Sequence, residues 1–318
     1  LYQQVTDAII ERMENGLVPW RMPWARAKEV PPQNLLNGNQ YKGVNFFLTL
    51  MCNYEYNYFL TFRQVKEYSE KKNPNHETEP WHVLKGSKAL PIVFWSFVYK
   101  CSETGKKVER KGPGRYERAD GMALPGAMVE AIPFLKLYKV FNVAQTNIPV
   151  EMYANPEEKP KGNVSLEERI EQAEKVLAGM PNPPEYVDGK GRAYYQRATD
   201  QLGMPEKERF VSIEHYYSTK FHELTHSTGH PKRLDRVDEM GQTFGDHNYC
   251  KEELVAELGA AFLCAVSGIN QPVIDNQAAY LKGWLERLKD DNRLFLSAAS
   301  KAKQAAKYIL GEAETSVL

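Results

Sequence analysis

The sequence lacks most features of a secreted, membrane-spanning or thiolate-zinc protein. It has four cysteines and no CxxC pair, so neither a disulfide framework nor a cysteine zinc finger is indicated. The longest weakly polar stretch, 255–269, contains a glutamate and is shorter than the roughly 20 apolar residues that span a bilayer. Residues 1–14 show no basic start followed by an apolar run. We therefore expect no secretion signal, no membrane association and a cytoplasmic location.

The composition also lacks any extreme. Hydrophobic residues make up 42% of the chain and charged residues 26%, which excludes wholesale disorder, collagen-like repeats and a long coiled coil. A length of 318 residues is enough for two domains of roughly 150 residues each. We expect a folded protein with a substantial apolar core.

A net charge of zero conceals two halves of opposite sign. Residues 1–150 carry a net charge of +6 and four of the five tryptophans, and the remainder carries −6. Basic and aromatic side chains together are typical of a surface for single-stranded nucleic acid, although an aromatic core beneath a solvated basic face has the same composition. A stretch rich in proline and charge lies between the halves. We predict a first domain at 1–150, a linker at 151–164 and a second domain at 165–318.

The expected elements make the fold class α+β. The first half shows a helical pattern at 2–15, strands at 84–100 and 134–143, and a basic segment at 106–118 that reads as a mobile loop. The second half is mainly helical, with a capping box at Ser165 and Glu168. Its expected helices start there and at 213–228, 251–266, 277–289 and 292–310, with a possible strand at 192–196.

The motif with the clearest chemistry is HExxH at residues 222–226. On a helix, His222 and His226 lie one turn apart on the same face, so both imidazoles can bind one zinc ion. Glu223 is then placed to take a proton from the water that the ion activates. Ser212 is a plausible N-cap for this helix, which Gly229 and a following proline would end.

The motif leaves the third protein ligand open. Glu253 and Glu257 would share one face of a later helix, and we favour Glu253 as ligand and Glu257 as the residue that orients a histidine. His230 is a second candidate, and Asp246 or His247 a third. We expect one Zn²⁺ per chain, with Mn²⁺ as an alternative. Donors for a developing oxyanion could be Tyr194, Tyr195 or His230.

Beyond this motif, the chain resembles the ArdC-type antirestriction proteins of plasmids and other mobile elements along nearly its whole length. In the second half the resemblance rests on residues 193–195, 204–205, 221–230, 233–234, 252–259, 280–284 and 302–306. In the first half it rests on 19–20, 23–24, 41–45, 61–62, 85–86 and 141–146. The sequence departs from the family at Ser227, where an aromatic residue is expected, and in the basic insert at 106–118.

The resemblance implies an N-terminal single-stranded-DNA-binding domain and a C-terminal zincin-like metallopeptidase domain. It also implies Glu253 as the third ligand and protection of incoming DNA from host restriction. The candidate DNA contacts are Trp20, Trp24, Tyr41, Lys42, Asn45 and Arg63, with Lys106, Lys107, Arg110, Lys111 and Arg115 as a phosphate clamp. The two tryptophans could equally pin the first helix to the sheet.

Three functions are compatible with these patterns. The first is a DNA-binding zinc metallopeptidase, with Glu223 as general base and a protein substrate that is bound to DNA or belongs to a host restriction system. The second is a non-enzymatic protector of DNA with a structural or vestigial metal site. A metal-dependent nuclease is the weakest, because the motif offers few of the carboxylates that a two-metal site needs.

Overall fold

The structure is a computed structural model of the chain, and it describes residues 2–16, 18, 20, 31–50, 52, 54–154, 165–236, 247–269 and 277–312. In chain order the helices are α1 (Tyr2–Glu14), α2 (Val44–Leu50), α3 (Phe62–Lys72), α4 (Leu166–Ala178), α5 (Ile213–Ser227), α6 (His247–Ser267), α7 (Gln277–Asp290) and α8 (Leu294–Ile309). The strands are β1 (Gln33–Asn34), β2 (Tyr58–Thr61), β3 (Leu90–Cys101), β4 (Lys107–Gly112), β5 (Arg115–Glu117), β6 (Ala123–Leu124), β7 (Val129–Asn142), β8 (Glu185–Val187), β9 (Tyr194–Gln196) and β10 (Gln201–Gly203).

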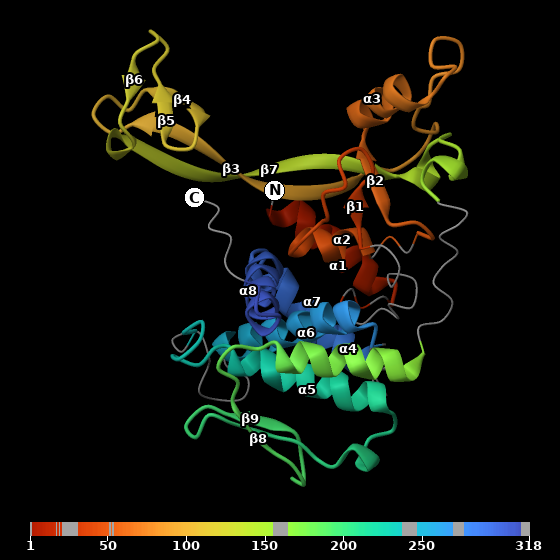
Figure 1. Cartoon of the computed structure of the whole chain (residues 1–318), viewed down its shortest axis with the longest axis vertical. Helices are drawn as coiled ribbons and strands as arrows, with labels where there is room; N and C mark the ends of the chain where they lie inside the picture. The colour runs from red at the N-terminus through yellow and green to blue at the C-terminus, as the bar shows by residue number, and fades with distance from the viewer. Residues whose placement is uncertain are drawn as a thin grey trace.

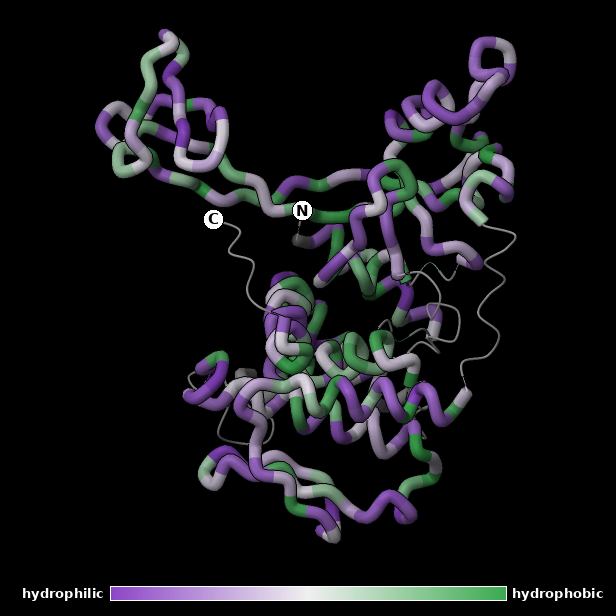
Figure 2. Tube along the Cα trace, viewed as in Figure 1, coloured by the Kyte–Doolittle hydropathy of each residue, from purple (hydrophilic) through white to green (hydrophobic). Residues whose placement is uncertain are grey.

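The architecture is mixed, with most strands in the first half and most helices in the second, as the α+β prediction requires (Figure 1). The capping box at the start of α4 is present, because the Ser165 side chain accepts the backbone N–H of Glu168 and the Glu168 carboxylate accepts that of Ser165. Along α4, hydrophilic and hydrophobic residues alternate (Figure 2), and Ala173, Val176 and Leu177 are buried. No described helix is both long and apolar enough to cross a membrane.

The larger sheet, as far as the described residues define it, has the strand order β1-β2-β7-β3-β4-β5-β6. Its central pair, β3 and β7, is antiparallel over its whole length, from Leu90 opposite Val140 to Cys101 opposite Val129. This pair forms a long ribbon that passes above α1 and α2 and carries β4, β5 and β6 at its far end (Figure 1). The buried amide of Asn45 fastens α2 to the ribbon, because it donates to the carbonyl of Val93 and accepts that residue's N–H.

The basic segment at 106–118 is not the loop that we expected, since it forms the hairpin of β4 and β5. Its turn contains Gly114 at a φ of +66°. Val108 is 3% exposed and packs with Cys101 and Leu124 in a small core of its own. The density of lysine and arginine hid the hairpin in the sequence, because they occupy its exposed positions and leave few apolar residues to reveal the alternation.

One apolar core runs through both halves of the chain. It contains residues of α1, α2 and β3 together with residues of α4, α5, α6, α7 and α8. The ring of Trp20 is fully buried and lies 5.6 Å from Phe295, and Phe47 lies 4.7 Å from Phe262. The ribbon is thereby joined to the helical half through side chains that are far apart in sequence.

A smaller sheet, β8-β10-β9, lies against α5. It is held to the end of that helix by Arg233, whose buried guanidinium donates to both carboxylate oxygens of Asp200 at 2.8 and 3.0 Å. The same guanidinium donates to the carbonyl of Ser227, the last residue of α5, at 2.9 Å. The sheet and the helix that carries HExxH therefore form one rigid unit.

Candidate metal centre

The HExxH motif lies in the second half of α5, and the local sequence explains why this helix forms. The side chain of Ser212 caps its N-terminus by accepting the N–H of His215 at 3.4 Å. Tyr217, Phe221 and Leu224 recur at helical spacing and are fully buried, so they fix one face of α5 in the core. The two motif histidines lie on a neighbouring face, where α6 packs.

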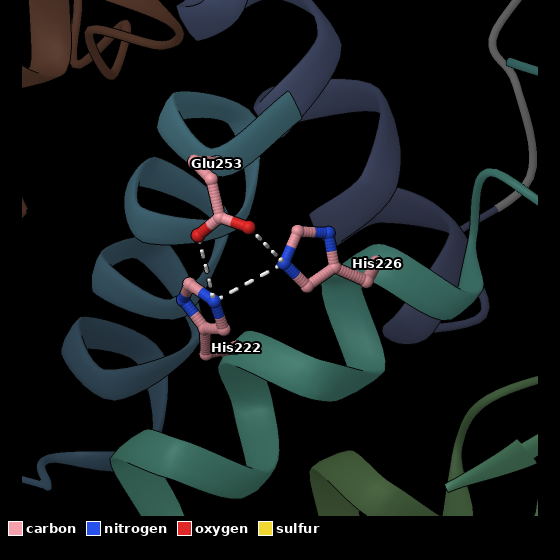
Figure 3. A group of neighbouring side chains, drawn as sticks. All are labelled: His222, His226 and Glu253. Carbon is pink, nitrogen blue, oxygen red and sulfur yellow. Dashed lines mark hydrogen bonds and ion pairs between the residues drawn. The ribbon is translucent and has the colours of Figure 1, made fainter. Parts of the chain in front are cut away.

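Three potential ligands converge between α5 and α6 (Figure 3). Nε2 of His222 and Nε2 of His226 are 3.1 Å apart, and the carboxylate of Glu253 lies 3.6 Å from the first and 3.5 Å from the second. Two ligands at 2.0–2.1 Å from one tetrahedral zinc ion are about 3.3 Å apart. The three side chains therefore fit a divalent ion without rearrangement of either helix.

The convergence depends on a close approach of the two helices. A Cβ atom at Gly259 would overlap the side chain of Thr225, which is itself fully buried on α5. The absence of a side chain at this position lets α6 approach α5 two residues beyond Glu257. Glu253 is thereby brought within reach of both histidines.

A second glutamate holds the other side of His226. Oε1 of Glu252 lies 3.5 Å from Nδ1 of that imidazole. The Glu252 carboxylate is buried and accepts two hydrogen bonds from Arg236. Nη2 of Arg236 lies 2.8 Å from one carboxylate oxygen and Nε lies 3.3 Å from the other. Arg236 is itself 6% exposed and donates to Oγ1 of Thr228, the residue that caps α5. This network orients His226 with its Nε2 towards the other ligands.

From the sequence we predicted that Glu257 orients a histidine, and this stays a prediction; the residue that lies 3.5 Å from Nδ1 of His226 in the structure is Glu252. Both residues are on α6, and Glu252 directly precedes the ligand. Its contact with His226 arises from the crossing of α5 and α6, which a periodicity argument does not contain. Arg236 lies in an irregular segment after α5, so no helical or strand pattern could have indicated it.

The charges of the centre follow from this arrangement. Burial disfavours the imidazolium form of His226, but hydrogen bonds to Glu252 and Glu253 outweigh burial and raise its pKa to about 10. Burial opposes the charge of Glu253 as well, yet its hydrogen bonds to His222 and His226 hold the pKa of this carboxyl well below its usual range. Without a metal, the centre is thus a compact ion pair.

The side chain of Glu223 is partly exposed and, among the described residues, forms no hydrogen bond or ion pair. A carboxylate without a structural partner beside the ligands can accept a proton, which is the property that the motif requires of it. His222 also keeps part of its surface open, with its side chain 21% exposed.

The other candidates near the motif do not join the ligand cluster. His230 lies in the turn after α5, where its Nδ1 accepts the N–H of Lys232 at 3.2 Å. Asp246 and the side chain of His247 lie outside the described residues. Tyr195 donates its hydroxyl to Asp200 at 2.9 Å, and burial together with this bond raises its pKa. Its hydroxyl is thus engaged in holding β9 to the end of α5.

Tyr194 lies beside Tyr195 on β9 and is partly buried. Its ring crosses Gly203 on β10, where a Cβ atom would overlap it. This contact fixes the ring across the small sheet. Tyr194 remains an oxyanion candidate on sequence grounds.

The candidate DNA contacts fall into two groups. Trp20, Tyr41 and Asn45 are at most 6% exposed and serve the core, so their side chains are not available to stack on or bind a strand. Trp24 lies outside the described residues. The remaining candidates are exposed lysines and arginines just before α2, on α3 and in the segment of the hairpin: Lys42, Arg63, Lys106, Lys107, Arg110, Lys111 and Arg115.

Comparison with known proteins first defines the class of each half. A family model described as zincin-like metallopeptidase matches residues 171–301, which contain α5 and α6. A second, described as the N-terminal domain of the anti-restriction factor ArdC, matches residues 1–141. The helical half is therefore zincin-like, and the ribbon half is an ArdC-type N-terminal domain.

The whole chain belongs to the ArdC antirestriction family. It is similar to the crystal structure of the ArdC antirestriction protein of plasmid R388 in its metal-free form, with 30% identity, a TM-score of 0.68, and coverage of 98% of this chain and 97% of that one. The Mn(II)-bound structure of the same protein matches with 30% identity and a TM-score of 0.67, over 99% of this chain and 98% of that one. These likenesses extend over both halves, so the fold prediction is confirmed.

Two curated relatives show the same extent of similarity. The uncharacterized protein y4eC of Sinorhizobium fredii is 30% identical, over 97% of this chain and 91% of that protein. The DNA primase TraC of Escherichia coli is 29% identical over 97% of this chain, but the match spans only 27% of TraC. This chain thus corresponds to about a quarter of the primase.

Proposed function

We propose that this chain is a single-stranded-DNA-binding metallopeptidase that acts in antirestriction. The observation that carries the peptidase part is the convergence of His222, His226 and Glu253, together with Glu223 on the same helix as the histidines, whose side chain has no partner among the described residues. Among the described residues three protein ligands converge, which is the number typical of a catalytic zinc site, whereas structural sites have four. The Mn(II)-bound state of the R388 relative supports a divalent ion, and we propose Zn²⁺ or Mn²⁺ here.

When bound, the ion would polarise a peptide carbonyl and make a water molecule acidic enough to attack it near neutral pH. The chain's own residues supply the rest. Glu223 accepts the proton of that water and returns it to the leaving amine. Glu252, held by Arg236, keeps His226 in one orientation, while Tyr194 or His230 would donate to the developing oxyanion.

DNA binding is supported by the basic hairpin and by the family. Five exposed cations lie between residues 106 and 115, and the ArdC-type N-terminal domain is the half that carries them. A basic surface binds a polyanion through release of its counterions, so affinity should fall steeply with salt. We propose that bound DNA brings the peptidase to proteins on the same DNA or to a host restriction system, in the cytoplasm.

We retain the division into 1–150 and 165–318 as functional domains joined by 151–164. The shared core around Trp20 and Phe47 implies that the two domains move as one body. Their common packing would hold the DNA surface at a fixed distance from the metal centre.

The test compares metal content and proteolysis in the wild type, two variants of the metal centre and one control variant. The wild type, Glu223→Gln and Glu253→Ala are purified with Zn²⁺ or Mn²⁺ and incubated with casein and oligothymidine, and Glu171→Gln on the exposed face of α4 serves as control. We expect Glu253→Ala to lose the metal and Glu223→Gln to keep it while losing cleavage. Unchanged cleavage by Glu223→Gln would contradict the mechanism. Metal binding and DNA binding without any cleavage would instead favour a non-enzymatic protector.

A further inference from the structure

The β3–β7 ribbon has two faces of different chemistry. Residues directly opposite each other in an antiparallel pair point to the same side, and residues two apart along a strand do so as well. The register pairs Phe94 with Lys136, Ser96 with Phe134, and Ile92 with Tyr138. We define the lysine–aromatic face as these six residues: Ile92, Phe94, Ser96, Phe134, Lys136 and Tyr138.

The aromatic rings of this face are open to solvent although they lie on a sheet. Phe94 is 45% exposed, Phe134 39% and Tyr138 37%. Phe94 and Tyr138 pack edge to face with ring centroids 5.6 Å apart, and Nζ of Lys136 lies 5.1 Å from the Tyr138 centroid. Exposed rings that alternate with a cation are unusual on a free surface, because each ring leaves apolar area in water.

The face is rigid at its inner end. Ile92 is 2% exposed and packs with Tyr41 and Phe59, which anchors this end of the ribbon in the body of the protein. On the other side of the same strand, Val93 is buried in the main core and bonded to Asn45. The exposed rings are therefore presented on a backbone that is fixed from both sides, which lowers the entropy cost of binding.

The opposite face of the ribbon also has exposed rings, but its cations are placed differently. Trp95 is 62% exposed and Phe97 42% exposed, and they lie opposite Leu135 and Pro133. The cations of this side lie at its two ends: Lys139 is opposite Pro91, and Nη1 of Arg110 donates to the hydroxyl of Tyr99 at 3.0 Å. On the lysine–aromatic face Lys136 lies among the rings themselves, which favours that face for a strand that stacks its bases and places a phosphate beside them.

Positive charge continues from this face towards the hairpin. Lys100 lies opposite Lys107 on β4, on the same side as Phe94, with Glu130 opposite it on β7. Like charges directly opposite each other are destabilising in a free sheet. Residues 94–139 as a whole contain nine lysines and arginines against five acidic residues. Glu109 and Glu117, which are opposite each other on β4 and β5, lie on this side as well, so the cations extend a phosphate path from the rings as far as Lys100 and Lys107.

We propose that the lysine–aromatic face is the stacking platform for single-stranded DNA, with bases on Phe94, Phe134 and Tyr138 and a phosphate at Lys136. Lys100, six residues along β3 from Phe94 and thus roughly 20 Å away, and Lys107 would bind phosphates further along the strand. Stacking on rings is tolerant of base identity, so the platform would bind single strands with little sequence preference. This inference rests on the proposed function, because it assigns the surface for the DNA binding proposed there.

The test uses the full-length chain and a fluorescein-labelled oligothymidine of about 20 nucleotides, longer than the ~4–16 nucleotides that one single-strand-binding fold occupies. The variant is Phe94→Ala with Phe134→Ala, both at exposed positions. The matched control is Trp95→Ala, which removes a more exposed ring from the opposite face of the same strand. Fluorescence anisotropy gives the dissociation constant, and circular dichroism checks that all proteins are folded.

We expect the double variant to bind at least about tenfold more weakly, and the control to bind as the wild type does. Lys136→Gln should reduce the slope of log affinity against log salt by roughly 0.7, the value for one phosphate of a single strand. Equal binding by wild type and double variant, or loss only in Trp95→Ala, would overturn the platform and leave DNA binding standing. No binding by the wild type would overturn the proposed function as well. A change in oligomeric state of the double variant with unaltered DNA affinity would identify the face as a contact between copies of this chain.

Discussion

The carboxylate of Glu252 faces Nδ1 of His226 at 3.5 Å, on the side of the imidazole away from the candidate ligands His222 and Glu253. The glutamate is buried and the imidazole side chain is 13% exposed, and the glutamate is held in turn by the guanidinium of Arg236 at 2.8 Å. The ligand set is thus supported by a network from α6 and the segment after α5. Its energetic importance can be tested without touching a ligand.

Glu252→Gln should weaken metal binding by roughly 10- to 100-fold, the usual loss when the partner of a metal-bound histidine is changed. The amide retains an acceptor for Arg236 but removes the negative charge that favours the orientation of His226. Titration against a chromophoric chelator would measure the affinity. Glu171→Gln on α4 is the control, and an affinity equal to wild type in Glu252→Gln would show that the network is not needed.

Metal affinity should rise with pH up to about 10, the pKa of His226 in the metal-free protein. Below that pKa a proton must leave His226 before the ion binds, which gives about a tenfold gain in affinity per pH unit. Calorimetry in buffers of different ionisation enthalpy would count the released protons. Metal binding without proton release at pH 7 would contradict a protonated His226 paired with Glu252 and Glu253 in the metal-free protein.

The same pKa predicts how the metal-free protein responds to pH. Because the folded pKa of His226 is raised from about 6.5 to about 10, its stabilisation is complete below the lower value and is lost as pH rises to the upper one. The midpoint temperature of thermal unfolding should therefore decrease as the pH rises from about 6.5 to about 10. Glu253→Gln, which removes one partner, should flatten this dependence, and a wild-type midpoint independent of pH would argue against the assignment.

Gly259→Ala should destabilise the fold by about 1–3 kcal/mol, because the added methyl group overlaps Thr225 and forces α6 away from α5. Metal affinity should fall with it, since Glu253 moves with α6. The matched substitution is Gly283→Ala in α7, where a Cβ atom meets nothing within 4 Å. It should stabilise the protein by about 0.5–1 kcal/mol through helix propensity. Urea unfolding measures the free energy of unfolding of both variants. Equal changes in the two would show that the close approach of α6 to α5 does not depend on the missing side chain at Gly259.

Trp20→Ala should cost about 3–5 kcal/mol, because it empties a fully buried site in the core that both halves share. Trp20→Phe should cost less, losing mainly the hydrogen bond from Nε1 to the Tyr280 hydroxyl at 2.9 Å. DNA affinity of folded Trp20→Phe should equal that of the wild type. A loss of DNA binding in a folded Trp20→Phe protein would instead mean that Trp20 contacts the DNA strand.

Local patterns in the sequence were sufficient for the helices of the second half. The capping box at Ser165, the apolar spacing along α5 and the glycine after α4 are interactions within one or two turns, so the sequence contains them directly. The hairpin at 106–118 was missed, because its stabilising contacts come from strands β3 and β6. Trp20 was ambiguous, because only packing decides whether an aromatic ring faces the core or solvent.

Residue types and their spacing along the chain specify which chemistry is available: two histidines one helical turn apart, a glutamate between them, and a pair of glutamates on a later helix. Packing between the elements assigns a place to each of those groups. It selected Glu253 for the ligand cluster and Glu252 for His226 through the crossing of α5 and α6, and it separated the ribbon's aromatic residues onto two faces through strand register. Helical spacing is local and can be read along the chain, whereas helix crossing and register depend on contacts between residues that are distant in sequence.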